Sequence, residues 1–275
     1  MGAREVGTPG GALLRALRER CGKTQLWVEA EAELASGYVQ RVESGKIAQP
    51  LRRTLERILA ALDARYSERR DILERFGYIV AAPLPSAEES RWAAAVCERE
   101  LRAVPFPAYA LDCATRLIAW NHHVPRLFGV AEDDRTCGRL AGASLLAAWF
   151  DPASPLAPLV AEPETFLPAL IRALRYELEQ FRAETWPTTL LAQLSDALPQ
   201  FRQYWETAER EPPPASAARA LVPVWLAVPD AGLLQFRLSA EPFARDARFR
   251  VVYFFPADPA TMRRCAAWAD EERPE

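Results

Sequence analysis

The order of apolar and polar residues divides the chain into an all-helical first part and a mixed second part. In residues 11–80, apolar side chains recur every three or four positions in five short runs, which predicts five helices. Thr24 is a natural N-cap for the second of these, because its hydroxyl can accept a free backbone N–H. Residues 1–10 contain Gly and Pro without periodicity, so we expect them to be disordered.

Prolines at 83 and 85 mark a linker, and Ser86 and Glu89 form a capping box that opens a helix to about residue 102. Beyond it, two strands are predicted by the stretches FPAYALD and RLIAWN, and residues 139–210 show the apolar period of helices. Three more strands are predicted by ALVPVWLAV, LLQFRLSAEPF and FRVVYFF, followed by a final helix at 259–271. This order is typical of an α+β unit, an antiparallel sheet with helices on one side. We therefore expect three segments: an all-α domain at 11–80, a linker and connecting helix at 81–103, and the α+β domain at 104–273.

Charge is distributed unevenly between these parts. Residues 1–80 hold 14 Lys and Arg against 11 Asp and Glu, whereas the remainder holds 20 against 26. A mildly basic head on an acidic body is typical of a small DNA-binding module joined to a domain that does not bind DNA. No apolar run reaches the roughly 18 residues that span a bilayer, and the N-terminus lacks an apolar signal core. A cytoplasmic protein without a membrane partner is expected.

Candidate chemistry is sparse. The five cysteines are scattered and form no CxxC pair, so neither a disulfide framework nor a zinc site is expected. The two histidines, His122 and His123, are adjacent, and neighbouring side chains on a helix diverge by about 100°, so they cannot easily share one metal. A single axial haem ligand is the alternative to a local structural role. The chain contains no GxSxG, GxGxxG, P-loop or HExxH motif, so we expect no enzyme, no metal and no cofactor.

The segment from Thr24 to Lys46 closely resembles the helix-turn-helix of the Xre-type, lambda-repressor-like family. Thr24-Gln25 opens the second helix, and Tyr38-Val39-x-Arg41-Val42-Glu43-x-Gly45-Lys46 closes the third without a gap. The resemblance implies that the start of the second helix meets phosphate, that exposed positions of the third reach base edges, and that flanking cations meet the backbone. The DNA-binding residues it implies are Gln25, Ser36, Gly37, Gln40, Arg41, Lys46 and Arg52.

Three positions depart from the usual pattern of that family. Glu29 stands where the second helix usually has Ala, Glu33 where the turn usually has Gly, and Ala35 where the third helix usually has a hydroxyl cap. A slightly reshaped helix pair is expected. The alternative is a protein–protein adaptor in which the helix-turn-helix has degenerated and the acidic body docks another protein.

The second part is similar to the PAS-like domain of MmyB-like regulators, an Xre subgroup. Four short motifs carry the resemblance in the family's order: Ala119-Trp120-Asn121, Leu127-Phe128-Gly129, Leu174-Arg175 and Phe201-Arg202-x-x-Trp205. The resemblance implies a ligand-binding domain, whose family members are thought to bind fatty-acid-like molecules. Seven of the eight tryptophans lie beyond residue 80 and could wall an apolar cavity. The ligand-binding residues predicted are Trp120, Asn121, Phe128, Trp149, Arg175 and Trp205, with Arg175 chosen for a ligand carboxylate.

Together these observations predict a homodimeric transcriptional regulator that binds double-stranded DNA and a small apolar ligand such as a fatty acid. Dimerisation is expected because one reading head rarely provides enough affinity and half-sites lie about 34 Å apart.

Overall fold

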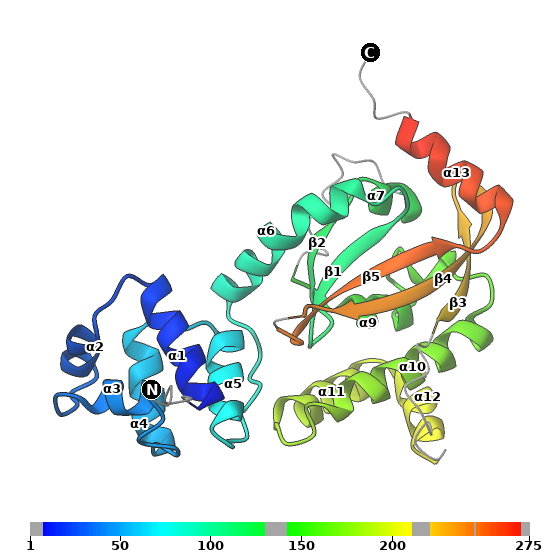
Figure 1. The fold of residues 1–275 in the computed structure, drawn as a ribbon. Coiled ribbons are helices and arrows are strands. Elements are labelled where there is room, and N and C mark those ends of the chain that lie inside the picture. The colour runs from blue at the N-terminus through cyan, green and yellow to red at the C-terminus, as the bar shows by residue number, and fades with distance from the viewer. Residues whose placement is uncertain (1–7, 130–141, 211–220, 245, 271–275) are drawn as a thin grey trace. The chain divides into compact units, whose positions relative to one another are not determined.

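The chain forms two compact units, Met1–Ala81 and Ala82–Glu275. The computed structural model describes residues 8–129, 142–210, 221–244 and 246–270. The first unit is helical, and the second combines a five-stranded antiparallel sheet with helices (Figure 1). This architecture confirms the predicted α+β fold class.

The first unit consists of five short helices around one apolar core. They are α1 (Pro9–Arg20), α2 (Gln25–Glu31), α3 (Tyr38–Glu43), α4 (Arg52–Ala61) and α5 (Tyr66–Arg75). Each contributes fully buried side chains to the core, among them Leu14, Val28, Val39, Ile58 and Leu73. Burying a side chain of this size stabilises the fold by about 1.5–3 kcal/mol. The apolar period of the sequence therefore corresponds to the inner faces of these helices.

The first helix begins earlier than its apolar period suggests. Thr8 is the N-cap, its Oγ1 accepts the backbone N–H of Gly11 at 3.1 Å, and Pro9 occupies the first helical position. The expectation of disorder is therefore wrong for residues 8–10, because a hydroxyl followed by Pro starts a helix. A Cβ on Gly11 would lie 2.5 Å from the carbonyl oxygen of Val42, so glycine permits close packing of α1 against the end of α3.

The second unit is built on a sheet of strand order β2-β1-β5-β4-β3 in which all neighbours are antiparallel. The strands are β1 (Ala108–Asp112), β2 (Leu117–Trp120), β3 (Val222–Val228), β4 (Gly232–Pro242) and β5 (Phe249–Pro256). The helices are α6 (Ala87–Ala103), α7 (His123–Leu127), α9 (Leu145–Phe150), the 3-10 turn η1 (Ala157–Leu159), α10 (Pro163–Glu179), α11 (Trp186–Ala197), α12 (Pro199–Glu209) and α13 (Pro259–Asp270).

Helices cover both faces of this sheet, so the expectation of helices on one side is wrong. The larger core includes Tyr109 and Leu111 of β1 together with side chains of α7, α9, α10 and α13. The alternate residues of β1, Ala108 and Ala110, face Cys97 and Leu101 of α6 in a smaller core. Because these two alanines are small, α6 can pack closely on the sheet. The helix predicted to be a connector is thus part of the second unit.

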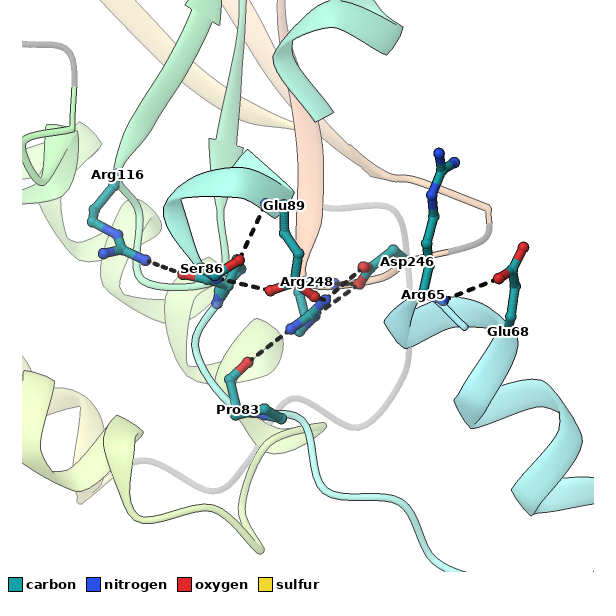
Figure 2. A network of polar contacts seen from close by, with 9 residues as sticks. Arg65, Glu68, Pro83, Ser86, Glu89, Arg116, Asp246 and Arg248 are labelled. Carbon is teal, nitrogen blue, oxygen red and sulfur yellow. Dashed lines mark hydrogen bonds and ion pairs between the residues drawn. The ribbon is translucent and has the colours of Figure 1, made fainter. Parts of the chain in front are cut away.

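A buried arginine holds the start of α6 against the segment before β5 (Figure 2). The guanidinium of Arg248 is 2% exposed and donates to Asp246 Oδ2 at 2.9 Å and to Glu89 Oε1 at 2.6 Å. It also donates to the carbonyl oxygen of Pro83 at 3.3 Å. Glu89 is itself part of the capping box with Ser86 that the sequence predicts. One charged network therefore ties residues 83–89 to the sheet.

Among the described helices, none has the length and apolar character that crossing a bilayer would need. Four of the cysteines among the described residues are free thiols, and three of these, Cys97, Cys113 and Cys265, are buried. Burial raises the pKa of the Cys97 thiol to about 11, so it is protonated at neutral pH. Cys137 lies outside the described residues.

Candidate functional site

The turn between α2 and α3 is held by the side chain of Glu29. This carboxylate is 3% exposed and accepts the backbone N–H of Gly37 at 3.0 Å and that of Val39 at 2.8 Å. These are the free N–H groups at the start of α3, which has no side-chain cap of its own. Glu29 therefore performs from α2 the capping that Ala35 cannot. The departure at position 29 orders the helix pair instead of disrupting it.

Glu33 completes the turn. Its backbone is left-handed, with φ of 50°, which is the conformation that a glycine would adopt more easily. Arg57 of α4 donates to the carbonyl oxygen of Glu33 at 2.9 Å and to its carboxylate at 3.1 Å. The turn therefore keeps the usual backbone shape, and Arg57 stabilises it from outside.

A buried ion pair fixes the end of α3. Arg18 of α1 donates to both carboxylate oxygens of Glu43, at 2.6 Å and 2.9 Å. Gln25 at the start of α2 donates its side-chain amide to the same carboxylate at 2.7 Å. The hydrogen bond with Glu43 raises the pKa of Arg18, which burial alone would lower. Three helices therefore converge on Glu43, and α3 is fixed at both ends.

The structure places the seven predicted DNA-binding residues in three settings. Gln40 and Arg41 are exposed on α3, Arg41 with its guanidinium 5.9 Å from the Tyr38 ring. Ser36 and Lys46 are exposed beside that helix, and Gly37 is its left-handed N-cap residue. The other two have intramolecular partners: Gln25 is half-buried on Glu43, and Arg52 pairs with Glu56 at 2.8 Å. Contact of each with DNA remains a prediction.

The second unit contains a cavity of about 810 Å³ between the sheet and helices α9 and α10. Its walls are mainly apolar, with Tyr109 and Val252 on the sheet, Trp149 on α9 and Leu174 on α10. The ring of Trp149 is held edge-on by Phe166 at 5.4 Å and by Phe128 at 6.2 Å. The volume lies within the roughly 300–1,000 Å³ of small-molecule pockets. An elongated apolar ligand would fit its size and its lining.

The cavity wall also carries a charged pair. Arg250 of β5 lies with its Nη2 3.0 Å from Glu177 Oε2 of α10, and both residues line the cavity. Arg172 of α10 and Gln180, the C-cap residue of that helix, add polar atoms to the lining. Burial raises the pKa of the Tyr109 phenol, which is therefore neutral and can act as a donor. Sequence reasoning missed Arg250 and Glu177, because neither lies in a recognisable motif.

Of the six predicted ligand-binding residues, Trp149 alone is among the described residues that line this cavity. Phe128 lies behind Trp149, and Trp120 is half-buried on β2. Trp205 stacks on Phe201 at 5.9 Å and donates to Glu209. Ligand contact by these residues remains a prediction, and the geometry favours it for Trp149.

The other motif residues have structural partners. Asn121 is 3% exposed, its Oδ1 accepts the N–H of Ala108 at 3.2 Å, and its Nδ2 donates to the carbonyl oxygen of Phe106 at 2.8 Å. Arg175 donates to the carbonyl oxygen of Ala208 and so joins α10 to α12. Gly129 has φ of 66°, and a Cβ there would lie 2.7 Å from Pro229. These motifs therefore build the frame around the cavity.

The rings of the two histidines lie close together, with centroids 3.8 Å apart and planes tilted by 41°. His123 is fully buried beside Trp268, and burial lowers its pKa to about 3, so it is neutral. Within the described parts of the chain, no group of three or more His, Cys, Asp or Glu side chains is placed to hold a metal ion.

Comparison with known proteins gives two family matches. Residues 11–72 match a helix-turn-helix domain, and residues 95–267 match the MmyB-like transcription regulator ligand binding domain. A search of curated proteins found no match. The second match covers more than half of the chain and contains the cavity, and the first contains α2 and α3. The chain therefore belongs to the MmyB-like transcription regulators, as a DNA-binding protein that responds to a ligand.

Proposed function

We propose that the ligand is a fatty acid or a similar single-chain amphiphile. The observation that supports this is the cavity itself, about 810 Å³ with mainly apolar walls and one charged pair. Each methylene group transferred from water into such a cavity contributes about 0.8 kcal/mol. A long alkyl chain with one polar end is the ligand whose chemistry this lining complements.

On the DNA side, α3 of residues 11–80 enters the major groove. Gln40 and Arg41 are the base-reading residues, because both are exposed and both side chains can hydrogen-bond base edges. Ser36 and Gly37 approach the duplex at the start of α3, and Lys46 and Arg52 neutralise phosphates. Gln25 gives the weakest of these contacts, because Glu43 already engages its amide.

The protein acts as a homodimer in the cytoplasm, where its DNA partner lies. Two copies reading half-sites about 34 Å apart provide the affinity that one short helix cannot. Residues 104–273 then form the sensor domain. Ligand binding there changes the spacing or availability of the two DNA-binding domains.

Two titrations of the full chain test this function. The first adds dodecanoic acid to delipidated protein and follows tryptophan fluorescence, with native mass spectrometry to count bound molecules. We expect quenching or enhancement from Trp149 and one added mass per chain. No spectral change together with no added mass would refute the fatty-acid ligand.

The second titration measures binding to a duplex selected from a random library at several salt concentrations. DNA binding through phosphates should weaken steeply with salt, because each neutralised phosphate releases counterions. An adaptor with a degenerate helix-turn-helix would select no duplex sequence and would show no such salt dependence. The capping role of Glu29 and the ordered turn at Glu33 favour the DNA-binding alternative.

A further inference from the structure

Arg250 is buried but has fewer polar partners than an arginine that serves only to stabilise the fold. Its side chain is 9% exposed, and its one ion pair within the described residues is with Glu177 at 3.0 Å. A guanidinium has five N–H donors, and burying it is costly unless they are satisfied. Arg248, two residues earlier, shows the satisfied case, with Asp246, Glu89 and the Pro83 carbonyl as partners. Arg250 instead has donor capacity left over on the wall of a cavity.

The surroundings of Arg250 are apolar. In β5 it shares a face with Val252, and its neighbour across the ladder in β1 is Leu111. All three line the cavity, and Tyr109 lies opposite Val252 in the same register. Among the described strand residues of the lining, Arg250 is the charged one. The sheet therefore presents a single cation to whatever occupies the cavity.

Glu177 is held less tightly than Arg250. Its side chain is 23% exposed, more than twice the exposed fraction of Arg250. It lies on α10 between Tyr176 and Glu179, which line the cavity and are exposed to solvent. A rotation of the Glu177 side chain could therefore return its carboxylate to water, whereas Arg250 is fixed in a central sheet strand.

We propose that Arg250 binds the carboxylate of the ligand and that Glu177 is an exchangeable counter-ion that the ligand carboxylate replaces. This deepens the proposed function, on which it rests, by naming the residue that selects an anionic head group. An exchange of one carboxylate for another keeps Arg250 paired with and without ligand, so the buried cation is never left alone. Arg175, chosen from the sequence, is not among the described residues that line the cavity, and its guanidinium donates to the carbonyl oxygen of Ala208.

The exchange has a consequence for selectivity. A neutral head group, such as an alcohol, leaves Glu177 on Arg250 and loses the charge-assisted hydrogen bonds of the carboxylate. The protein should therefore bind the acid more tightly than the alcohol. This preference is smaller than it would be if Arg250 had no partner in the ligand-free protein, because the ligand carboxylate must displace Glu177. Removal of the Glu177 charge should strengthen acid binding and leave alcohol binding nearly unchanged.

The test measures dissociation constants of dodecanoic acid and 1-dodecanol for the delipidated full chain by isothermal titration calorimetry. The wild type should prefer the acid about tenfold, which corresponds to roughly 1.4 kcal/mol. Arg250→Met should lower this preference to about one, with alcohol affinity unchanged within about threefold. Glu177→Gln should tighten acid binding several-fold. The double variant Arg250→Met/Glu177→Gln leaves no unpaired carboxylate, so it keeps the measurement valid if the single variant folds poorly.

The matched control is Arg172→Met, which removes an exposed arginine from the same cavity lining. It should keep the wild-type preference. The inference is overturned if Arg250→Met keeps the preference, if Arg172→Met loses it, or if Glu177→Gln weakens acid binding. A wild type that binds acid and alcohol equally overturns the head-group assignment alone. A wild type that binds neither overturns the fatty-acid function together with this inference.

Discussion

Replacement of Glu29 by alanine tests whether a single carboxylate holds the DNA-binding helix in place. The two hydrogen bonds that it accepts, at 3.0 Å from Gly37 and 2.8 Å from Val39, would be lost. Hydrogen bonds to a charged acceptor contribute about 1.5–3 kcal/mol each, and water reaching the half-buried Gly37 recovers part of that. We therefore expect Glu29→Ala to lower the local opening free energy of α3 by about 2–4 kcal/mol.

Native-state hydrogen exchange of the full chain, read by mass spectrometry on peptides covering 34–44, measures this quantity directly. A loss of about 2–4 kcal/mol corresponds to exchange faster by roughly 30- to 1,000-fold. Glu29→Gln keeps one acceptor oxygen and should show about half the loss. Glu31→Ala, an exposed glutamate on the same helix, is the control and should change the opening free energy by less than about 0.5 kcal/mol. If Glu29→Ala exchanges at the wild-type rate in this peptide, the capping role is refuted.

Four further predictions concern other contacts of the two units. Arg18→Met should lower the free energy of unfolding of the first unit by about 3–5 kcal/mol, because it leaves the buried Glu43 carboxylate without its cation. Thermal unfolding measures this loss, and an unchanged free energy of unfolding would show that the pair does not stabilise the unit. Arg41→Ala should weaken binding to the selected duplex by about 1–3 kcal/mol in an anisotropy titration, and unchanged affinity would reject its base-reading role. Dodecanoic acid should bind about fifteenfold more tightly than decanoic acid by calorimetry, from two methylenes at about 0.8 kcal/mol each, and equal affinities would show that the chain lies outside the cavity. Arg248→Met should lower the free energy of unfolding, measured in urea at pH 7, by roughly 3 kcal/mol, and this loss should shrink below about pH 4. Burial raises the pKa of Glu89, but hydrogen bonds from Arg248 and from the Ser86 N–H lower it overall. The stabilisation by the Glu89 carboxylate is therefore fully present above the ordinary carboxylate pKa of about 4.3 and is lost as the pH falls through the lowered pKa.

The sequence predicts the helices and strands well, because their burial follows simple periods. Val39 and Val42 are core residues at helical spacing, and Tyr109 and Leu111 alternate with Ala108 and Ala110 along a strand. Local patterns record which face of an element is buried. They do not record what packs on the other face, so the position of α6 on the sheet could not be predicted.

The sites are harder to predict because their side chains meet across long sequence separations. Glu29 looks like a departure from the helix-turn-helix pattern until its two backbone partners are seen. Asn121 lies in a motif and therefore seems functional, yet it closes a structural hydrogen-bond network. Arg250 and Glu177 lie in no motif, and only the packing of α10 against the sheet brings them together in the cavity. A short motif therefore marks a position that the fold needs, which need not be a position that a ligand touches.

The most direct test of a ligand-responsive DNA-binding protein is the dissociation constant of the selected duplex, measured by fluorescence anisotropy without ligand and with saturating dodecanoic acid. The ligand should change this constant by a measurable factor, and the duplex should change the affinity for the acid by the same factor, because coupling between two sites is reciprocal. Identical constants under both conditions, with the acid shown to be bound, would contradict the account.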